Sequence, residues 1–222
     1  MSEHIIEVRD LTKKYPGVMA LKGVSFDITK NTVHCIVGEN GAGKSTFIKI
    51  MTGAIQKSSG EIQYNGKEYQ PKNIKDAMKA GMSVLYQELN VVDDLTVKEN
   101  LTLGIEESRG GVLKYGPTSE KLFKVLKQFA PEIDLDSKVE KLSVGKKQII
   151  EIAKAVALET ALIIMDEPTA AISEKEAERL LELIRNLKKH NVTVIFISHR
   201  LAEIMEIGDN VTVFRDGQVI GT

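Results

Sequence analysis

The sequence predicts an α/β fold, and four short segments carry that prediction. Residues 32–37 (TVHCIV) are apolar and largely β-branched, which is typical of a buried strand. Residues 46–53 (TFIKIMTG) have helical spacing and end at a glycine that can stop a helix. Two further apolar runs, at 161–165 (ALIIM) and 192–197 (VTVIFI), are also typical of strands, and a helical stretch separates them. Strands and helices therefore alternate along the chain.

The turn between the first strand and its helix reads GENGAGKST and matches the pattern G-x-x-x-x-G-K-[ST]. Its glycines permit backbone conformations that a Cβ would block, so that successive N–H groups can converge on phosphate oxygens at a helix N-terminus. Lys44 would reach the β- and γ-phosphates, Ser45 would offer a hydroxyl to Mg²⁺, and Thr46 could reach the α-phosphate. The expected nucleotide-binding residues here are Gly38, Glu39, Asn40, Gly41, Ala42, Gly43, Lys44, Ser45 and Thr46.

Two acidic residues end the apolar run at 161–165. Asp166 would hold Mg²⁺, directly or through water, while Glu167 could polarise the water that attacks a γ-phosphate. Adjacent side chains point in different directions, so the two roles differ. The alternative is that the acids begin a surface loop before Pro168. The phosphate-binding motif upstream favours the catalytic interpretation.

Three further features narrow the class of protein. Residues 142–148 read LSVGKKQ, Gln87 lies between the two nucleotide motifs, and His199 follows the run 192–197 in the tripeptide SHR. The ordered set resembles the nucleotide-binding domain of an ABC transporter. The resemblance implies a P-loop NTPase fold with an antiparallel β subdomain and a helical subdomain, and it implies ATP and Mg²⁺ as cofactors.

The resemblance also implies roles for single residues. His199 would lie against the γ-phosphate, and Gln87 would contact Mg²⁺ and the attacking water. Tyr15 would stack on the adenine ring. Ser143 and Gly145 would contact ATP held by an opposite, second ATP-binding domain. The implied sets are catalytic Glu167, His199, Gln87 and Lys44, and metal-binding Ser45, Gln87 and Asp166.

Two segments point to a subgroup of this family. Residues 86–104 and 166–173 resemble the first ATP-binding half of ribose- and galactose-type monosaccharide import ATPases. This implies ATP hydrolysis that energises sugar import through integral membrane permease subunits and a sugar-binding protein, at the cytoplasmic face of the cell membrane. Ser173 departs from the Asp usual in the wider family. Because Glu176 follows three residues later, we expect Ser173 to cap a helix over 174–189.

The chain is expected to form a single ATP-binding domain over 1–222, as one half of a tandem protein. Strands are predicted at 5–9 and 24–28, and an Asn65-Gly66 turn predicts a hairpin within 61–69. Residues 88–143, where the apolar pattern turns helical, are the expected helical subdomain. Another hairpin is predicted at 211–221, around an Asp-Gly turn.

Composition agrees with a globular domain of ordinary character. Of 222 residues, 42% are hydrophobic and 27% charged, and 30 basic against 31 acidic residues give a net charge of −1. No overall field favours nucleic acid. The single Cys35 excludes a disulfide framework, and no apolar run reaches the length of a membrane span.

Two other functions remain open at this stage. A soluble ABC-type ATPase acting on ribosomes or DNA would use the same nucleotide motifs, but it would need basic surfaces or long coiled coils. A nucleotide sensor that does not hydrolyse ATP is the other alternative, and the intact catalytic set argues against it.

Overall fold

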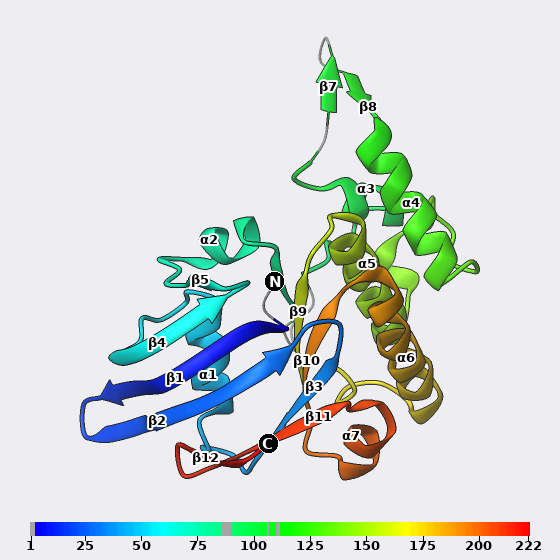
Figure 1. The fold of residues 1–222 in the computed structure, drawn as a ribbon. Coiled ribbons are helices and arrows are strands. Elements are labelled where there is room, and N and C mark those ends of the chain that lie inside the picture. The colour runs from blue at the N-terminus through cyan, green and yellow to red at the C-terminus, as the bar shows by residue number, and fades with distance from the viewer. Residues whose placement is uncertain (1–2, 86–89, 106, 110–111) are drawn as a thin grey trace.

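The computed structural model describes residues 3–85, 90–105, 107–109 and 112–222. Within them, a six-stranded sheet of order β12-β11-β3-β10-β9-β6 forms the centre of the molecule (Figure 1). All its neighbouring strands pair in parallel except β11 with β12. The strands are β3 Val33–Val37, β6 Met82–Leu85, β9 Leu162–Asp166, β10 Thr193–Ile197, β11 Asn210–Arg215 and β12 Gln218–Gly221. The α/β fold predicted from the strand–helix alternation is confirmed.

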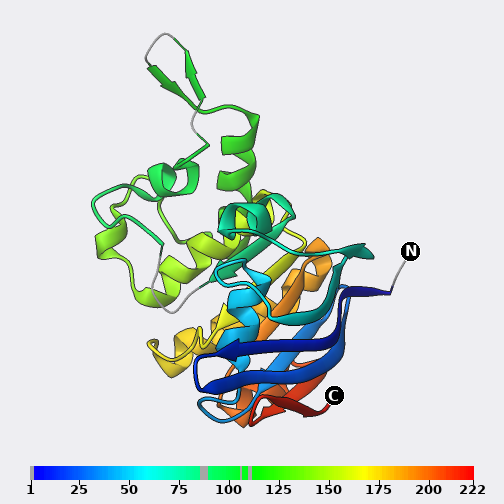
Figure 2. The same cartoon turned by 90° about the vertical axis from the view of Figure 1, so that its left-hand side faces the viewer.

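A second sheet is antiparallel and lies beside the first, as Figure 2 shows. It contains β1 His4–Tyr15, β2 Val18–Thr29, β4 Ser59–Tyr64 and β5 Lys67–Glu68. Asn65 and Gly66, both at positive φ, form the turn of the predicted hairpin between β4 and β5. The antiparallel subdomain is thus confirmed, although β1 and β2 run well beyond the predicted strands at 5–9 and 24–28.

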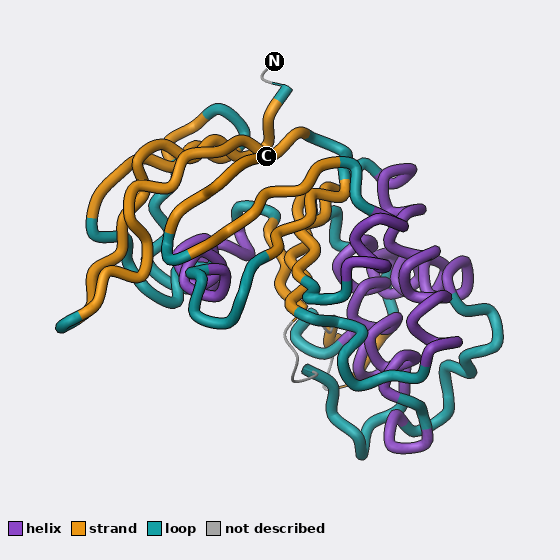
Figure 3. Tube along the Cα trace, turned by 90° about the horizontal axis from the view of Figure 1, so that it is seen from below, coloured by secondary structure: helices purple, strands orange, loops and turns teal. Residues whose placement is uncertain are grey.

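The central sheet is buried on both faces, as its continuous apolar runs require. Side chains alternate between two cores: Ile36, Ile164 and Ile195 face α1 and the antiparallel sheet, whereas Cys35 and Ile163 face the remaining helical layer. Figure 3 shows most helices gathered on that second side. The helices are α1 Lys44–Met51, α2 Ile74–Lys79, α3 Val97–Thr102, α4 Pro117–Phe129, α5 Val144–Ala157, α6 Glu174–Asn186 and α7 Leu201–Ile207.

The region expected to be helical, 88–143, contains α3, α4 and the 3₁₀ turn Val139–Lys141. It also contains a short hairpin of β7 Glu107–Arg109 and β8 Val112–Lys114, which projects at the top of Figure 1. The helix predicted at 174–189 is α6, which ends at Asn186 and continues as the 3₁₀ helix Leu187–His190. Its predicted cap is confirmed, because Ser173 and Glu176 form a reciprocal capping box.

The buried His34 makes stability depend on pH. Its Nε2 lies 2.7 Å from the Thr212 hydroxyl, its Nδ1 has no hydrogen-bond partner among the described residues, and burial lowers its pKa to about 4. Between pH 4 and about 6.5, this histidine is protonated in the unfolded chain but mostly neutral in the folded chain. Its contribution to the free energy of unfolding is therefore fully present above about pH 6.5 and is lost as the pH falls toward 4.

We expect acidification from pH 7 to pH 5 to remove roughly 2 kcal/mol of unfolding free energy through this residue alone. Urea unfolding of the parent and of His34→Gln at pH 7 and at pH 5 measures this change in unfolding free energy. The variant should lose that part of the pH dependence, whereas His190→Gln, at an exposed position, should retain it. Equal pH dependence in parent and His34→Gln would contradict the assignment.

Candidate active site

A glycine-rich loop connects β3 to α1. Gly38 and Gly43 have φ of 153° and 107°. A Cβ on Gly38 would lie 2.2 Å from the Phe214 carbonyl oxygen, and one on Gly43 would lie 2.9 Å from that of Ala20. Glycine is therefore required here because neighbouring backbone is packed against the loop. Helix α1 begins with no side-chain cap and no acidic residue in its first turn, so its N-terminus can receive an anion.

Lys44 folds back over this loop. Its Nζ donates hydrogen bonds to the carbonyl oxygens of Gly38, at 2.6 Å, and of Glu39, at 3.0 Å. The ammonium is thereby held beside the loop whose backbone N–H groups would bind phosphate. Its charge also acts to lower the pKa of Asp166.

The two acids and the histidine lie at the carboxyl ends of neighbouring strands. β9 and β10 pair in parallel, with Asp166 opposite Ile197, and the Glu167 N–H donates to the Ile197 carbonyl at 2.9 Å. Glu167 has a left-handed backbone, with φ of 50°, a conformation that non-glycine residues adopt at some cost. Its Oε1 lies 3.2 Å from His199 Nδ1. The structure thus brings Glu167 and His199 together although 32 positions separate them.

Asp166 carries a negative charge that its surroundings do not fully compensate. Burial raises its pKa, and the neighbouring Glu167 raises it further, while Lys44 and Lys49 act in the opposite direction. A cation bound at Asp166 would stabilise the charged form of its carboxylate. The carboxylate of Asp166 and the hydroxyl of Ser45 are oxygen donors of the kind that Mg²⁺ prefers, so the residues present fit that ion.

The predicted signature residues begin a different helix. Ser143 is the N-cap residue of α5, and its side chain makes no capping hydrogen bond. A Cβ on Gly145 would lie 3.2 Å from the Cβ and Oε1 of Glu176, so α6 packs closely against this helix start. Hydrogen bonds from the hydroxyls of Ser143 and Ser173 hold the pKa of Glu176 below its usual value. Because α1 and α5 pack on opposite faces of the central sheet, these residues belong to a separate surface from the P-loop.

The roles of two other predicted residues stay predictions. Tyr15 ends β1, and the ammonium of Lys13 lies 5.1 Å from the centre of its ring, so its stacking on a base stays a prediction. Gln87 lies outside the described residues, and its role also stays a prediction.

Sequence reasoning missed a buried carboxylate beneath the site. Glu203, only 6% exposed, accepts hydrogen bonds at 2.8 Å from the hydroxyls of Thr169 and Ser198. Thr169 follows Glu167 by two residues, and Ser198 precedes His199, so one carboxylate joins the two loops that carry the reacting groups. A signal was available: Glu203 occupies the core face of α7 together with Ile204 and Ile207, where an acid is unusual.

Substituting Glu203 should slow turnover without weakening nucleotide binding. We expect Glu203→Ala to lower kcat about tenfold or more, because the two loops lose their common acceptor and small displacements of reacting groups are costly. KM for ATP should change less than about twofold. Steady-state kinetics with Glu206→Gln, an exposed acid on the same helix, provide the control. An unchanged kcat would contradict the positioning role.

A glycine-rich loop with its lysine, two carboxylates at the end of β9 and a histidine after the neighbouring β10 define a P-loop nucleotide-binding protein. The family model "ABC transporter" matches residues 21–170. The chain belongs to this family.

Curated relatives and solved structures agree with that assignment. The chain is 44% identical over 217 residues to the ribose import ATP-binding protein RbsA 1 of Rubrobacter xylanophilus, covering 98% of this chain and 44% of the relative. It is 43% identical over 224 residues to the xylose import ATP-binding protein XylG of Thermoanaerobacter pseudethanolicus, again covering 44% of the relative. The ADP conformation of MJ1267, an ATP-binding cassette, superimposes with a TM-score of 0.89 at 29% identity and covers 99% of this chain and 91% of that one. The chain thus spans under half the length of its curated relatives.

No helix in the described part of the chain combines the length and apolar character needed to cross a membrane.

Proposed function

We propose that this chain is the ATP-hydrolysing domain of a monosaccharide importer, and that it works at the cytoplasmic face of the membrane. The observation that carries the proposal is the contact between Glu167 and His199 beside the P-loop. The import function is supported by relatives named for ribose, xylose and L-arabinose transport, which match 98–100% of the chain. The proposed domain extends over 1–222, with a helical subdomain at about 88–143.

The residues at the P-loop would bind and neutralise the triphosphate. Backbone N–H groups at the start of α1 and the ammonium of Lys44 would hold phosphate oxygens. Ser45, Asp166 and Gln87 would hold Mg²⁺, which neutralises developing phosphate charge when bound. Tyr15 would stack on the adenine.

Hydrolysis would proceed by in-line attack of water on the γ-phosphorus. Glu167 would accept the proton of that water, and the hydrogen bond from His199 would keep the carboxylate in one orientation while the imidazole lies near the γ-phosphate. Gln87 would help position the water. Glu203 would hold the two loops in fixed positions relative to each other through its hydrogen bonds with Thr169 and Ser198.

A second ATP-binding domain would complete the site. Ser143 and Gly145 lie at an uncapped helix start, separate from the chain's own P-loop, which supports a role in binding the γ-phosphate of ATP held by an opposite domain. Two such domains, on the same or different chains, would then close on two ATP molecules.

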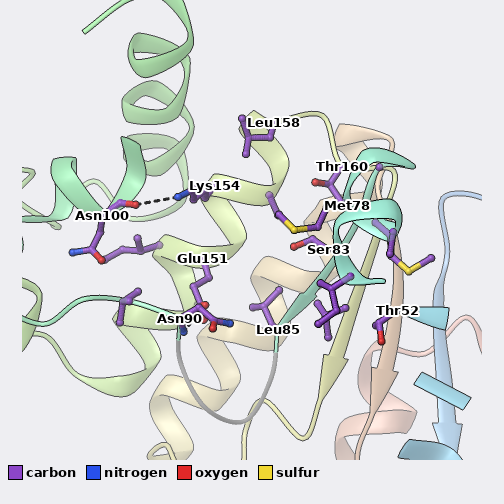
Figure 4. A pocket seen from close by; sticks show the side chains of 18 residues that line it. Thr52, Met78, Ser83, Leu85, Asn90, Asn100, Glu151, Lys154, Leu158 and Thr160 are labelled. Atoms are coloured by element: carbon purple, nitrogen blue, oxygen red, sulfur yellow. Dashed lines mark hydrogen bonds between the residues drawn. The ribbon is translucent and has the colours of Figure 1, made fainter. Parts of the chain in front are cut away.

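The membrane permease subunits would dock on a groove beside β6 and α5. This pocket has a volume of about 460 Å³, and α2 forms part of its wall (Figure 4). The apolar residues that follow Gln87 would form this coupling surface, and their alternative role is packing in the core of the lobe. Val91 lines the pocket and Val92 is exposed, Leu95 is partly buried, and Leu89 lies outside the described residues. A sugar-binding protein would deliver the sugar on the far side of the membrane, and the proposal includes no nucleic-acid partner.

Reconstitution tests this proposal. The full-length importer ATPase containing this chain, placed in vesicles with permease subunits of the ribose or xylose class, should hydrolyse ATP faster when a sugar-loaded binding protein is added. A matched preparation with Glu167→Gln should show no such increase. A rate that is unaffected by permease, binding protein and each of these sugars would contradict a role in monosaccharide import.

A further inference from the structure

The groove proposed for the permease has largely apolar walls, and among the described residues that line it one, Glu151, carries a carboxylate. Figure 4 shows side chains from α2 and β6 on one side and from α5 on the other, with Glu151 between them. Two side chains at the rim of the groove, Met78 and Leu158, are 64% and 42% exposed. The residues lining the interior include Ala77, Met82, Val84, Leu85, Val91 and Ile150.

Asn90 hydrogen-bonds this carboxylate, and its backbone and side chain both act to lower the pKa of Glu151. Glu151 Oε1 accepts a hydrogen bond from the Asn90 N–H at 2.9 Å. Its Oε2 is buried and has no hydrogen-bond partner among the described residues. Leaving a buried polar atom without a hydrogen bond is unfavourable, and more so when the group is charged.

The neighbouring basic side chain, Lys154, is turned toward other acceptors. It lies one turn along α5, and its Nζ donates to the carbonyl oxygens of Asn100, at 3.2 Å, and Leu103, at 2.8 Å. Its charge acts to lower the pKa of Glu151, yet burial dominates and raises that pKa. The described residues therefore compensate the Glu151 carboxylate incompletely.

Docking of a partner would increase the energetic cost of burying the Glu151 carboxylate unless the partner supplies a hydrogen-bond donor or a positive charge. An apolar helix seated on the groove would cover the part of the Glu151 side chain that is still exposed, and Oε2 would remain without a donor. A basic side chain satisfies both needs, because its aliphatic stem packs on apolar walls while its head donates a charge-assisted hydrogen bond.

We propose that the segment docking in this groove presents an apolar face with one basic side chain, which pairs with Glu151 Oε2. The inference rests on the proposed function, in which permease subunits bind here, and it specifies their contact: Arg or Lys at the centre of the docking segment. Glu151 thereby selects partners, since a docking segment that lacks the basic group leaves the carboxylate buried and unpaired.

Binding to purified permease subunits in lipid nanodiscs tests the pairing. The full-length ATPase containing this chain is titrated against them, as parent and as Glu151→Gln, which keeps the size of the side chain and the acceptor for Asn90. We expect Glu151→Gln to bind at least about tenfold more weakly, and with a smaller loss of affinity as salt rises. Glu178→Gln, at an exposed position on α6, is the matched control and should bind like the parent. ATP affinity, measured in parallel, verifies that each variant is folded.

A second series identifies the partner residue. Each Arg or Lys in the cytoplasmic loops of the permease is changed to Gln and combined with Glu151→Gln in a double-mutant cycle. We expect one basic residue to account for the loss, so that its substitution weakens binding to the parent but not to Glu151→Gln. Additive effects at every basic residue, or equal affinity of parent and Glu151→Gln, would overturn the inference while leaving permease binding intact. Failure of the parent itself to bind would instead remove the proposed function on which the inference rests.

Discussion

Replacing Glu167 with Gln is expected to reduce the rate of ATP hydrolysis by about 10²–10⁴-fold while leaving ATP affinity within about twofold. The amide keeps the size of the side chain and can still contact His199, which lies 3.2 Å from Oε1 in the parent, but it cannot accept a proton from water. Phosphate binding depends on the loop and Lys44, which the substitution does not touch. Single-turnover hydrolysis together with equilibrium ATP binding measures both effects.

A matched control comes from a surface acid remote from the site. Glu182→Gln removes the same charge from an exposed position on α6 and should hydrolyse ATP at the parent rate. Equal turnover in Glu167→Gln and the parent would contradict the role of Glu167 as the proton acceptor.

Replacing Lys44 with Ala should remove binding and turnover together. The Lys44 ammonium is held at the loop by the carbonyl oxygens of Gly38 and Glu39, where it would meet the phosphates. Losing one charge-assisted contact to phosphate costs about 3 kcal/mol, or on the order of 100-fold in affinity. Calorimetric titration with ATP and Mg²⁺ measures the loss.

The control for this substitution lies on the same helix. Lys49→Ala removes an exposed lysine from the last turn of α1 and should weaken ATP binding less than about threefold. Undiminished affinity in Lys44→Ala would show that the lysine does not bind phosphate.

The sequence predicts local structure well where one residue has one conformational role. The P-loop glycines and the Asn65-Gly66 turn adopt the positive φ angles that such residues favour. The predicted capping box at Ser173 also forms, since it depends only on neighbours along the chain. The ends of β1 and β2 escaped prediction because polar residues extend these strands, and backbone pairing does not require apolar side chains.

Contacts between distant segments could not be derived from local patterns. The approach of His199 to Glu167 depends on β10 lying beside β9, and strand order is a property of the whole sheet. Glu203 and Glu151 illustrate the same limit. Each is an acid inside an apolar helical pattern. Only the surrounding structure reveals that Glu203 binds two hydroxyls through Oε2 and Arg200 through Oε1, whereas Glu151 Oε2 has no hydrogen-bond partner among the described residues.

The central claim is that two ATP-binding domains build each hydrolysis site, one through the P-loop and the other through Ser143 and Gly145. The most direct measurement is the ATPase rate per chain against protein concentration, with Mg²⁺, for the parent and for an equal mixture of Lys44→Ala and Ser143→Ala chains. The account predicts a rate per chain that climbs with concentration, and a mixture that regains activity which neither variant shows alone, because Lys44→Ala retains an intact signature surface and Ser143→Ala an intact P-loop. A rate per chain that stays constant on dilution, together with a mixture no more active than its components, would contradict it.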